Sequence, residues 1–433
     1  MERKLAIVVI FHHIGPYHHA RLNAAADRLS VTGLEWSGKA YDTWGAAESP
    51  AHYQKISLFL EATDRYPGKA ELLRAFSLAL EQANPDVVAV NGWNNFGSLV
   101  AANCCVRLGI PMIVMSESAR QDEPRTWWKE MIKQRIVGVY SAALVGGQRH
   151  VEYLVELGMP RERVFTGYDV VDNDYFAERA LEIRNSNPPQ ADGIRKKYGL
   201  PENYFLASAR FIEKKNLPRL IRAYAKYRQR SSAFANQPLR KATAGQEATA
   251  GREVGNQKSE VTAPWDLVLL GDGPLKPDLC RLISDLRLIA HMHLPGFKQY
   301  EELPVYYALA KAFVHPSTTE QWGLVMNEAI ASALPVIVSE RCGCVPELVG
   351  DNGFTFDPLN EDELTARLLD MASQSDHDLE RLREASRRIA ARFGPELFGK
   401  GLEQAASMAM QLKRKKFGVI DRALVFAAAR YGR

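Results

Sequence analysis

The chain has 433 residues, a formal net charge of +4, 46% hydrophobic and 24% charged residues. Two or three ordinary globular domains are expected at this length and composition, and the lack of any run of eighteen apolar residues argues against a transmembrane helix. Five cysteines, an odd number, favour a reducing cytoplasm over a secreted disulfide framework.

The first half alternates strand and helix patterns, which is typical of a doubly wound parallel sheet. Helices are predicted between the strands, the first over residues 17–29, and the strands are predicted at residues 5–11, 86–90, 111–115, 142–145 and 164–166. Residues 5–11 are too short for a signal peptide and lack a small-residue cleavage site, so we interpret them as the first strand. The loop at 12–16 has one glycine, Gly15, and imidazoles gather around it at His12, His13, His18 and His19. A metal site is one interpretation of these imidazoles, and packing with one acceptor contact is the other.

Polar residues follow the strand at 111–115, on the edge where a cleft would form. Glu117 and Asp122 are the candidates there for polar contacts with a substrate. The next helix, at 124–137, mixes basic residues with Trp127, Trp128, Met131 and Ile132. This pattern indicates either a helix that lies on an anionic bilayer or grips a lipid-linked acceptor, or a stripe that faces the core.

A second alternating pattern begins with a strand at 204–208, after a polar stretch whose composition is that of a linker. Arg210 and Lys215 lie between this strand and a helix at 217–230, where both cations would point to the edge of the sheet. An arginine fork and a lysine point charge suit a diphosphate, although two surface cations are the alternative. Residues 231–264 have little apolar content and are predicted to be a disordered insertion.

Two glutamates stand at the centre of the second half, with seven residues between them. Glu320 is expected in a loop after the strand at 312–314, and Glu328 in the helix that follows. The backbone amides of Gly323 and Leu324, at the start of that helix, could approach a phosphate. Carboxylates on either side of an anion site suit a sugar nucleotide, whereas two solvated glutamates are the alternative interpretation.

The segment from Glu320 to Glu328, with Gly343, Pro346 and Gly353 in order after it, resembles the glutamate-x7-glutamate motif of the family-four retaining glycosyltransferases. The likeness extends over residues 7–402 and is denser in the second half. It implies an α/β fold of the GT-B type, in which two doubly wound Rossmann-like domains face each other across a cleft. The domains would be residues 1–176, a linker at 177–200, residues 201–393 with the insertion, and residues 394–433 as a helix that crosses back plus a basic tail.

The resemblance also implies roles for individual residues. Glu328 would hold the ribose hydroxyls and Glu320 the hydroxyls of the donor sugar. The donor diphosphate would be held by Arg210, Lys215 and the amides of Gly323 and Leu324. These cations replace the divalent metal of other transferases, so neither a metal nor a cofactor is expected. The first domain would contribute Gly15 and Glu117, but it lacks the double glycine and the histidine that many members have.

The expected activity is transfer of a sugar from a UDP- or GDP-sugar to a hydroxyl of a glycan or lipid-linked glycan in polysaccharide biosynthesis. Attack from the face that the nucleotide leaves would retain the anomeric configuration without a protein nucleophile. The rival hypotheses are a nucleotide-sugar epimerase or phosphorylase, and a non-catalytic subunit of a polysaccharide-assembly complex. Residues 411–433 carry seven basic residues against Asp421, interleaved with apolar ones. This tail predicts contact of the cytoplasmic protein with the inner face of an anionic membrane, and nucleic acid is not an expected partner.

Overall fold

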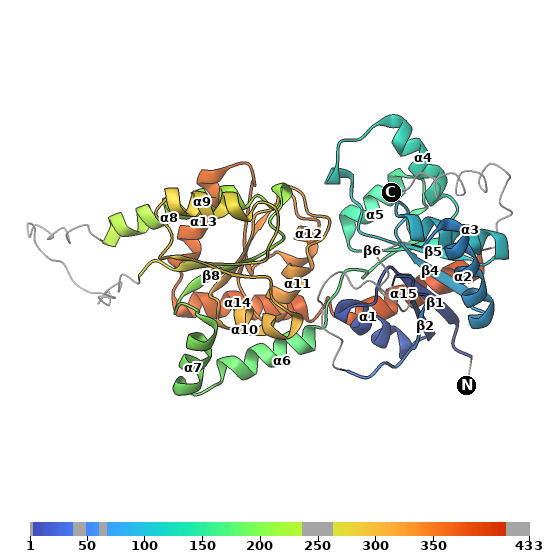
Figure 1. Cartoon of the computed structure of the whole chain (residues 1–433), viewed down its shortest axis with the longest axis horizontal. Helices are drawn as coiled ribbons and strands as arrows, with labels where there is room; N and C mark the ends of the chain where they lie inside the picture. Colours follow the sequence, from blue (N-terminus) through green and yellow to red (C-terminus); the bar gives the residue numbers. More distant parts are fainter. Residues whose placement is uncertain (1–2, 38–48, 60–66, 236–262, 413–433) are drawn as a thin grey trace, which may run out of the picture.

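Two parallel sheets organise the chain in the computed structural model, which describes residues 3–37, 49–59, 67–235 and 263–412. Each sheet forms the centre of one lobe, and the two lobes lie side by side (Figure 1). The first sheet has the order β3-β2-β1-β4-β5-β6-β7. Its strands are β1 (Ala6–Phe11), β2 (Ser30–Glu35), β3 (Gln54–Ser57), β4 (Val87–Asn91), β5 (Met112–Ser116), β6 (Ala142–Val145) and β7 (Val164–Thr166).

The second sheet is also parallel throughout, with the order β10-β9-β8-β11-β12-β13. Its strands are β8 (Tyr204–Ser208), β9 (Asp266–Leu270), β10 (Met292–Gly296), β11 (Ala312–His315), β12 (Val336–Ser339) and β13 (Gly353–Phe356). In both sheets the strand order reverses beside the first strand, at β1 and β4 and at β8 and β11. Such a reversal opens a crevice at the carboxyl ends of the strands, which is where ligands bind in open parallel sheets.

Helices cover both sheets, so the central strands are nearly continuous apolar runs. In the first half the helices are α1 (Pro16–Ala26), α2 (Lys69–Ala83), α3 (Phe96–Leu108), α4 (Trp127–Val137), α5 (Gln148–Glu156), α6 (Asn173–Arg184) and α7 (Pro188–Tyr198). In the second half they are α8 (Leu217–Ala235), α9 (Lys276–Asp285), α10 (Leu303–Leu309), α11 (Leu324–Ala331), α12 (Val345–Leu348), α13 (Glu361–Ala372), α14 (Asp376–Ala390) and α15 (Pro395–Gln411). The two doubly wound α/β domains predicted from the sequence are therefore confirmed.

The chain passes between the lobes twice. The polar stretch predicted as a linker folds as most of α6 and all of α7, because Asp172 and Asn187 each cap the following helix with a side-chain oxygen. Helix α6 packs against α10 and α11 of the second lobe, where Phe176 joins the core. Helix α15 returns to the first lobe and packs against α1, β6 and β7, as Figure 1 shows for the red helix among the blue elements. The predicted division at residues 176 and 177 stays a prediction.

Several boundaries differ from those expected. Strands β2 and β3 were not predicted, and the first helix ends at Ala26 rather than at residue 29 because β2 starts at Ser30. Helix α8 runs into the predicted insertion as far as Ala235, and residues 236–262 lie outside the described part. Of the basic tail, residues 413–433 also lie outside it. Within the described residues, none of the helices has the length and hydropathy needed to span a bilayer.

Helix α4 decides between the two interpretations of its apolar residues. Trp127, Trp128, Met131 and Ile132 are all exposed, whereas Ile136 and Val137 at its end are buried. The interpretation that the four apolar residues face the core is therefore wrong. The last turn of the helix is buried in the domain, and Glu130 and Lys133 also hydrogen-bond Tyr153 of α5. The apolar face of the first two turns remains open.

Candidate functional site

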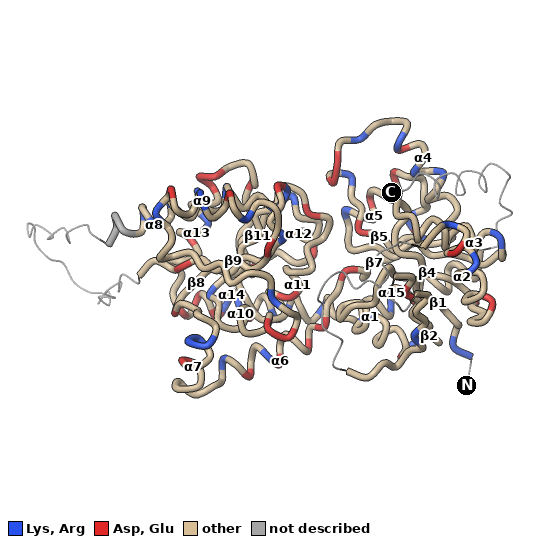
Figure 2. The backbone as a smooth tube through the Cα atoms, in the orientation of Figure 1, with Lys and Arg blue, Asp and Glu red and all other residues tan. Residues whose placement is uncertain are grey.

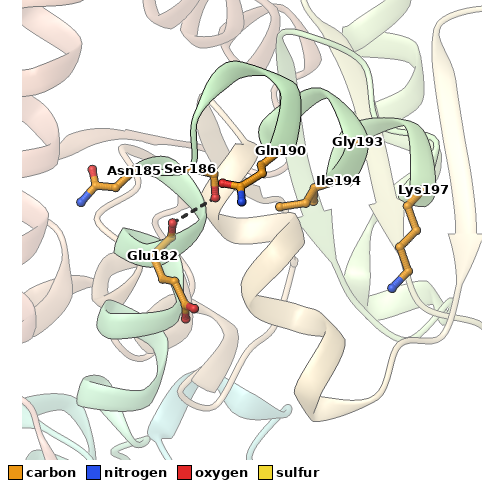
Figure 3. Close-up of a pocket in the computed structure, with 7 residues that line it drawn as sticks. All are labelled: Glu182, Asn185, Ser186, Gln190, Gly193, Ile194 and Lys197. Carbon is orange, nitrogen blue, oxygen red and sulfur yellow. Dashed lines mark hydrogen bonds between the residues drawn. The ribbon is translucent and has the colours of Figure 1, made fainter.

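A cavity of about 500 Å³ lies at the carboxyl ends of β8 and β9 in the second domain. It collects three of the residues that the sequence singled out, Arg210, Lys215 and Glu328. The rest of its lining is Ser208, Ala209, Leu270, Gly271, Asp272, Phe297, Lys298, Leu303 and Val325. A second cavity of about 540 Å³ lies between α6 and α7 (Figure 3). It contains none of those candidates, so the first cavity is the candidate site.

Arg210 is placed by a tight turn from the neighbouring strand. Gly271, directly after β9, has a positive φ of 122°, and a Cβ there would lie 1.9 Å from the Ala209 carbonyl oxygen. Only glycine allows the two loops to approach this closely. This turn therefore fixes the backbone next to Arg210. Within the described residues Arg210 has no acidic partner, so its guanidinium is available to an anion.

Lys215 and Glu320 form an ion pair in which both side chains are 12% exposed. Glu320 Oε2 also accepts a hydrogen bond from Ser317 and lies 3.1 Å from His315 Nε2. Burial alone would raise the pKa of Glu320, but the His315 contact and the Lys215 charge outweigh it and hold that pKa well below its usual range. Glu320 is therefore a carboxylate at neutral pH, directly beside the lysine.

Asn216 explains why these two side chains meet. It has a left-handed backbone at φ 57°, and its Nδ2 donates to the carbonyl oxygens of Pro316 and Pro358 at 3.0 and 2.9 Å. These bonds tie the end of the lysine loop to the loop that leads to Glu320. Sequence reasoning did not identify Asn216, although an asparagine directly before a helix is a recognised signal for a special backbone conformation.

Glu328, in α11, has a different environment. Its side chain is buried, and its two oxygens accept hydrogen bonds from Tyr17 of the first domain and from Tyr307 at 2.6 Å. Burial raises the pKa of Glu328 to about 7, although the two tyrosine bonds pull it down. The alternative of a solvated surface glutamate is wrong for Glu328. Neither tyrosine was a candidate from the sequence, because only the tertiary structure brings them to this carboxyl.

The start of α11 has the geometry expected for an anion site. Gly323 is the N-cap with φ 98°, a conformation that favours glycine, and Leu324 is the first helical residue. A Cβ on Gly323 would lie 3.2 Å from Glu320 Cγ. The free backbone amides at this end of the helix are therefore close to the Lys215 and Glu320 pair.

The loop that contains Glu320 is also held by residues of the first domain, on α5. The imidazole Nε2 of His150, at the start of α5, lies 2.9 Å from the Gln321 carbonyl oxygen. The Gln148 amide donates to Glu347 at 2.6 Å, and Arg149 donates to the Cys342 carbonyl at 2.8 Å. The domains thus meet beside the central motif, and α5 positions the loop from outside it.

Glu117 belongs to a buried group of charges in the first domain. Its carboxyl lies next to that of Asp169, which is completely buried and lies 3.9 Å from Arg21. Burial and the Glu117 charge raise the pKa of Asp169 well above its ordinary value, and burial likewise raises the pKa of Glu117. The negative charge of Glu320, across the domain boundary, adds to the effect on Glu117. Glu117 therefore faces the same region as the second-domain residues, and Asp169 is a partner that sequence reasoning missed.

Gly15 lies at the start of α1 with an extended backbone, and apart from the adjacent residues no protein atom lies within 4 Å of a Cβ built on it. The fold does not require glycine there, and contact with a substrate stays a prediction. The loop before it is held by Glu35, which accepts a hydrogen bond from the Ile14 amide at 2.9 Å. The four histidines point into separate environments: His12 packs on Trp36, His13 contacts Glu35, His18 packs on Phe11, and His19 contacts Tyr53 and Ser49. Across the described ranges no three metal-ligating side chains of the His, Cys, Asp and Glu types come together.

Comparison with known proteins identifies similarities in sequence and in fold. Residues 191–389 match the family described as "Glycosyl transferases group 1". The alpha-D-kanosaminyltransferase of Streptomyces kanamyceticus is 24% identical over 281 residues, 61% of this chain and 62% of that protein. The alpha-monoglucosyldiacylglycerol synthase of Acholeplasma laidlawii is 41% identical over 71 residues, 16% of this chain and 18% of that protein. The chain covers only about a fifth of the length of the first curated relatives it matches.

Among solved structures, Anabaena Alr3699/HepE in complex with UDP and glucose superposes with a TM-score of 0.65 at 15% identity. The superposition covers 93% of this chain and 99% of the Anabaena chain. A likeness at this level of identity concerns the fold. The GT-B arrangement of two facing α/β domains, predicted from the sequence, is confirmed by the two parallel sheets and by this similarity.

Proposed function

We propose that the chain is a retaining glycosyltransferase, because residues 191–389 match the family described as glycosyl transferases group 1. The donor would be a UDP- or GDP-sugar and the acceptor a hydroxyl of a glycan or lipid-linked glycan. The observation that carries the proposal is one cavity, at the carboxyl ends of parallel strands, that is lined by Arg210, Lys215 and Glu328. Its 500 Å³ lies within the usual range for a small-molecule site.

We assign the donor diphosphate to Arg210, Lys215 and the amides of Gly323 and Leu324. A guanidinium fork and an ammonium form charge-assisted hydrogen bonds to phosphate oxygens, and they offset the charge that develops on the departing nucleotide. Lys215 is already beside Glu320, so a diphosphate at this position would share the lysine with that carboxylate. These groups act electrostatically, and the proposed reaction needs neither a metal nor a cofactor.

Glu328 would accept hydrogen bonds from the ribose hydroxyls, because it is a buried carboxyl at the wall of the cavity. Glu320, an ionised carboxylate beside the start of α11, would accept them from hydroxyls of the donor sugar. Two acceptors on either side of an anion site match the order of groups in a sugar nucleotide. The first domain would supply Glu117 and the region of Gly15 on the acceptor side.

Cytoplasmic location and attachment to the inner face of an anionic membrane are part of the proposal. The composition of residues 411–433 supports them, because seven cations interleaved with apolar residues are attracted to anionic headgroups. Deletion of residues 413–433 is expected to reduce co-sedimentation with anionic vesicles in a salt-sensitive manner. Unchanged co-sedimentation would remove this part.

The transfer itself is tested by release of nucleoside diphosphate from UDP-glucose and GDP-mannose, with and without added glycan and lipid acceptors. We expect nucleoside diphosphate to be released only when an acceptor is present. The glycosidic bond of the product should have the same anomeric configuration as the donor sugar. Arg210→Ala should turn over at least about a hundredfold more slowly. Conversion of the donor to an epimer without any acceptor would instead support the rival enzyme class. Donor binding without turnover on any acceptor would favour the non-catalytic subunit.

A further inference from the structure

Helix α4 presents four large apolar side chains that the described part of the chain leaves partly or largely exposed. Their exposed fractions are 77% for Trp127, 48% for Trp128, 51% for Met131 and 37% for Ile132. The spacing of these residues, two adjacent pairs four apart, places all of them on one face of the helix. An exposed cluster of this size on one short helix indicates an interaction surface rather than scattered surface residues.

The charges around this face are predominantly positive. Lys133 lies 3.1 Å from both Glu123 and Glu130, and Arg125 lies 3.6 Å from each of them, so the two acids are neutralised within the domain. Lys129 and Arg135 are exposed, and neither has an acidic partner in the part of the chain that the structure describes. The Lys129 ammonium lies 5.7 Å from the centre of the Trp128 ring. Two cations that have no acidic partner among the described residues therefore accompany the aromatic residues on α4.

The helix is also directly connected to the candidate site. Glu117 and Asp122 precede it in the chain, and Asp122 accepts a hydrogen bond from Gln321, the residue after Glu320, at 3.5 Å. Figure 2 shows this segment running from the side of the second domain to α4, with both acidic and basic residues along it. A molecule bound at the exposed face would thus lie next to the first-domain wall of the site.

We propose that the α4 face, defined as Trp127, Trp128, Lys129, Met131, Ile132 and Arg135, docks on a lipid bilayer that contains anionic headgroups. Tryptophan is the side chain that prefers the boundary between headgroups and acyl chains, and cations beside it are attracted to anionic lipids. A helix with this composition lies flat in the boundary, with its apolar face inward. The docking does not depend on the basic tail, because every residue of the face lies in α4.

A second copy of the chain is a poorer occupant. From typical side-chain areas, the four apolar residues expose on the order of 400–500 Å². A stable protein interface buries about 800 Å² on each partner, and its centre is usually depleted of unpaired lysine. The face is too small and too positive for that use, whereas both properties suit a bilayer surface.

Docking at α4 has a consequence for the substrate, which rests on the proposed function. When the α4 face lies on the bilayer, the nearby wall of the cleft that contains Glu117 lies at the level of the headgroups. The acceptor hydroxyl would then belong to a lipid that stays in the membrane during transfer, and the donor would enter from the aqueous side.

Co-sedimentation of the full chain with vesicles of equimolar phosphatidylcholine and phosphatidylglycerol tests the docking surface. Combined Trp127→Ser and Trp128→Ser substitutions are expected to lower the partition coefficient by about tenfold or more. Lys129→Gln and Arg135→Gln should each lower it about fivefold on these vesicles and leave it unchanged on pure phosphatidylcholine. Leu181→Ser and Ile289→Ser are matched controls, because these side chains are 57% and 69% exposed on the second domain, and they should have no effect.

Partition of the double tryptophan variant equal to that of the parent would overturn the proposal. So would a dimer, measured by light scattering, that the same variant converts to a monomer, because the occupant would then be a second copy. Calorimetric titration with UDP and GDP, run in parallel, separates this result from the proposed function. The α4 variants should bind nucleotide like the parent, whereas a parent that binds vesicles but neither nucleotide would contradict only the proposed function.

Discussion

The hydroxyl of Tyr17, in α1 of the first domain, donates a hydrogen bond to the carboxylate of Glu328 in α11 of the second. Tyr307 occupies the other oxygen of the same carboxylate at 2.6 Å. The Tyr17 ring packs edge-on against Tyr300, with ring centres 5.7 Å apart. Each oxygen of the carboxyl proposed to bind ribose therefore already has a tyrosine partner, and one of these tyrosines comes from the opposite domain.

Replacement of Tyr17 by phenylalanine tests whether this contact competes with the donor. A ribose hydroxyl needs a Glu328 oxygen, so loss of the Tyr17 bond should tighten binding. A hydrogen bond to a charged group contributes about 1.5–3 kcal/mol, and we expect a gain of about tenfold after the packing change is included. Calorimetry with UDP-glucose or GDP-mannose, whichever the parent binds, measures it.

Tyr300→Phe is the control for that substitution, because Tyr300 packs on Tyr17 but makes no hydrogen bond to Glu328. It should leave the affinity unchanged. Weaker binding by Tyr17→Phe than by the parent would mean that Tyr17 contacts the donor directly and does not compete with it.

Donor affinity should depend on pH through Glu328. Its folded pKa of about 7 is raised, so the ionised fraction increases from roughly a tenth at pH 6 to roughly nine tenths at pH 8. A carboxylate can accept two ribose hydrogen bonds and a protonated carboxyl cannot, so the affinity should increase about tenfold over this interval. A sugar nucleotide, rather than the free diphosphate, is the appropriate ligand because its diphosphate does not titrate there. In Glu328→Gln the affinity should be low and flat, and an equally steep profile in that variant would assign the titration to another group.

The sequence could predict those site residues that lie together in one loop after one strand. Glu320 and Glu328 follow one strand and enter one helix, and Arg210 and Lys215 follow another, so the local pattern already directs them to the same edge of the sheet. Tyr17 lies 311 positions away from Glu328, and no local pattern links them. Asp169 could not be identified for the same reason, because Glu117 and Arg21, with which it interacts, lie on other elements.

The missed strand β2 has a comparable cause. Gly33 interrupts its pattern, and glycine within a strand argues against a strand assignment. The structure explains the glycine: a Cβ there would lie 2.8 Å from Leu22 and 2.9 Å from Tyr53, so packing of α1 against the sheet requires it. Glu35, at the end of β2, is buried because it accepts a hydrogen bond from the Ile14 amide in the loop after β1. The sequence alone does not predict this long-range contact.

Glu35 should contribute stability that disappears in acid. Burial would raise its pKa, but bonds from His13, Ser57, Ile14 and Lys55 lower it to about 2. A lowered folded pKa gives stability that is present above the unfolded value and is lost as pH falls through the folded one. The difference in unfolding free energy between the parent and Glu35→Gln should therefore shrink by about 2 kcal/mol between pH 7 and pH 3. Urea unfolding at the two pH values measures this difference, and a constant difference would contradict the assignment.

Gly343 should be essential to the loop that carries Glu320. A Cβ at this position would lie 1.6 Å from the Gln321 carbonyl oxygen, which is backbone and cannot move aside alone. Gly343→Ala is expected to destabilise the protein by about 1–3 kcal/mol and to weaken donor binding, because the displaced loop also carries Glu320. Gly350→Ala is the control, since its nearest neighbour is the Ile389 side chain at 3.8 Å. Equal thermal stability of the two variants would show that the loop tolerates the change.

The convergence of Arg210, Lys215, Glu320 and Glu328 on one donor is tested most directly by calorimetric titration of UDP and GDP into the parent and into Arg210→Ala. Lys214→Ala is the matched control, because this lysine precedes Lys215 but does not line the cavity. We expect the parent and the control to bind one of the two nucleotides alike, and Arg210→Ala to bind it at least about tenfold more weakly. Equal affinity of Arg210→Ala and the parent would contradict the placement of the diphosphate in this cavity.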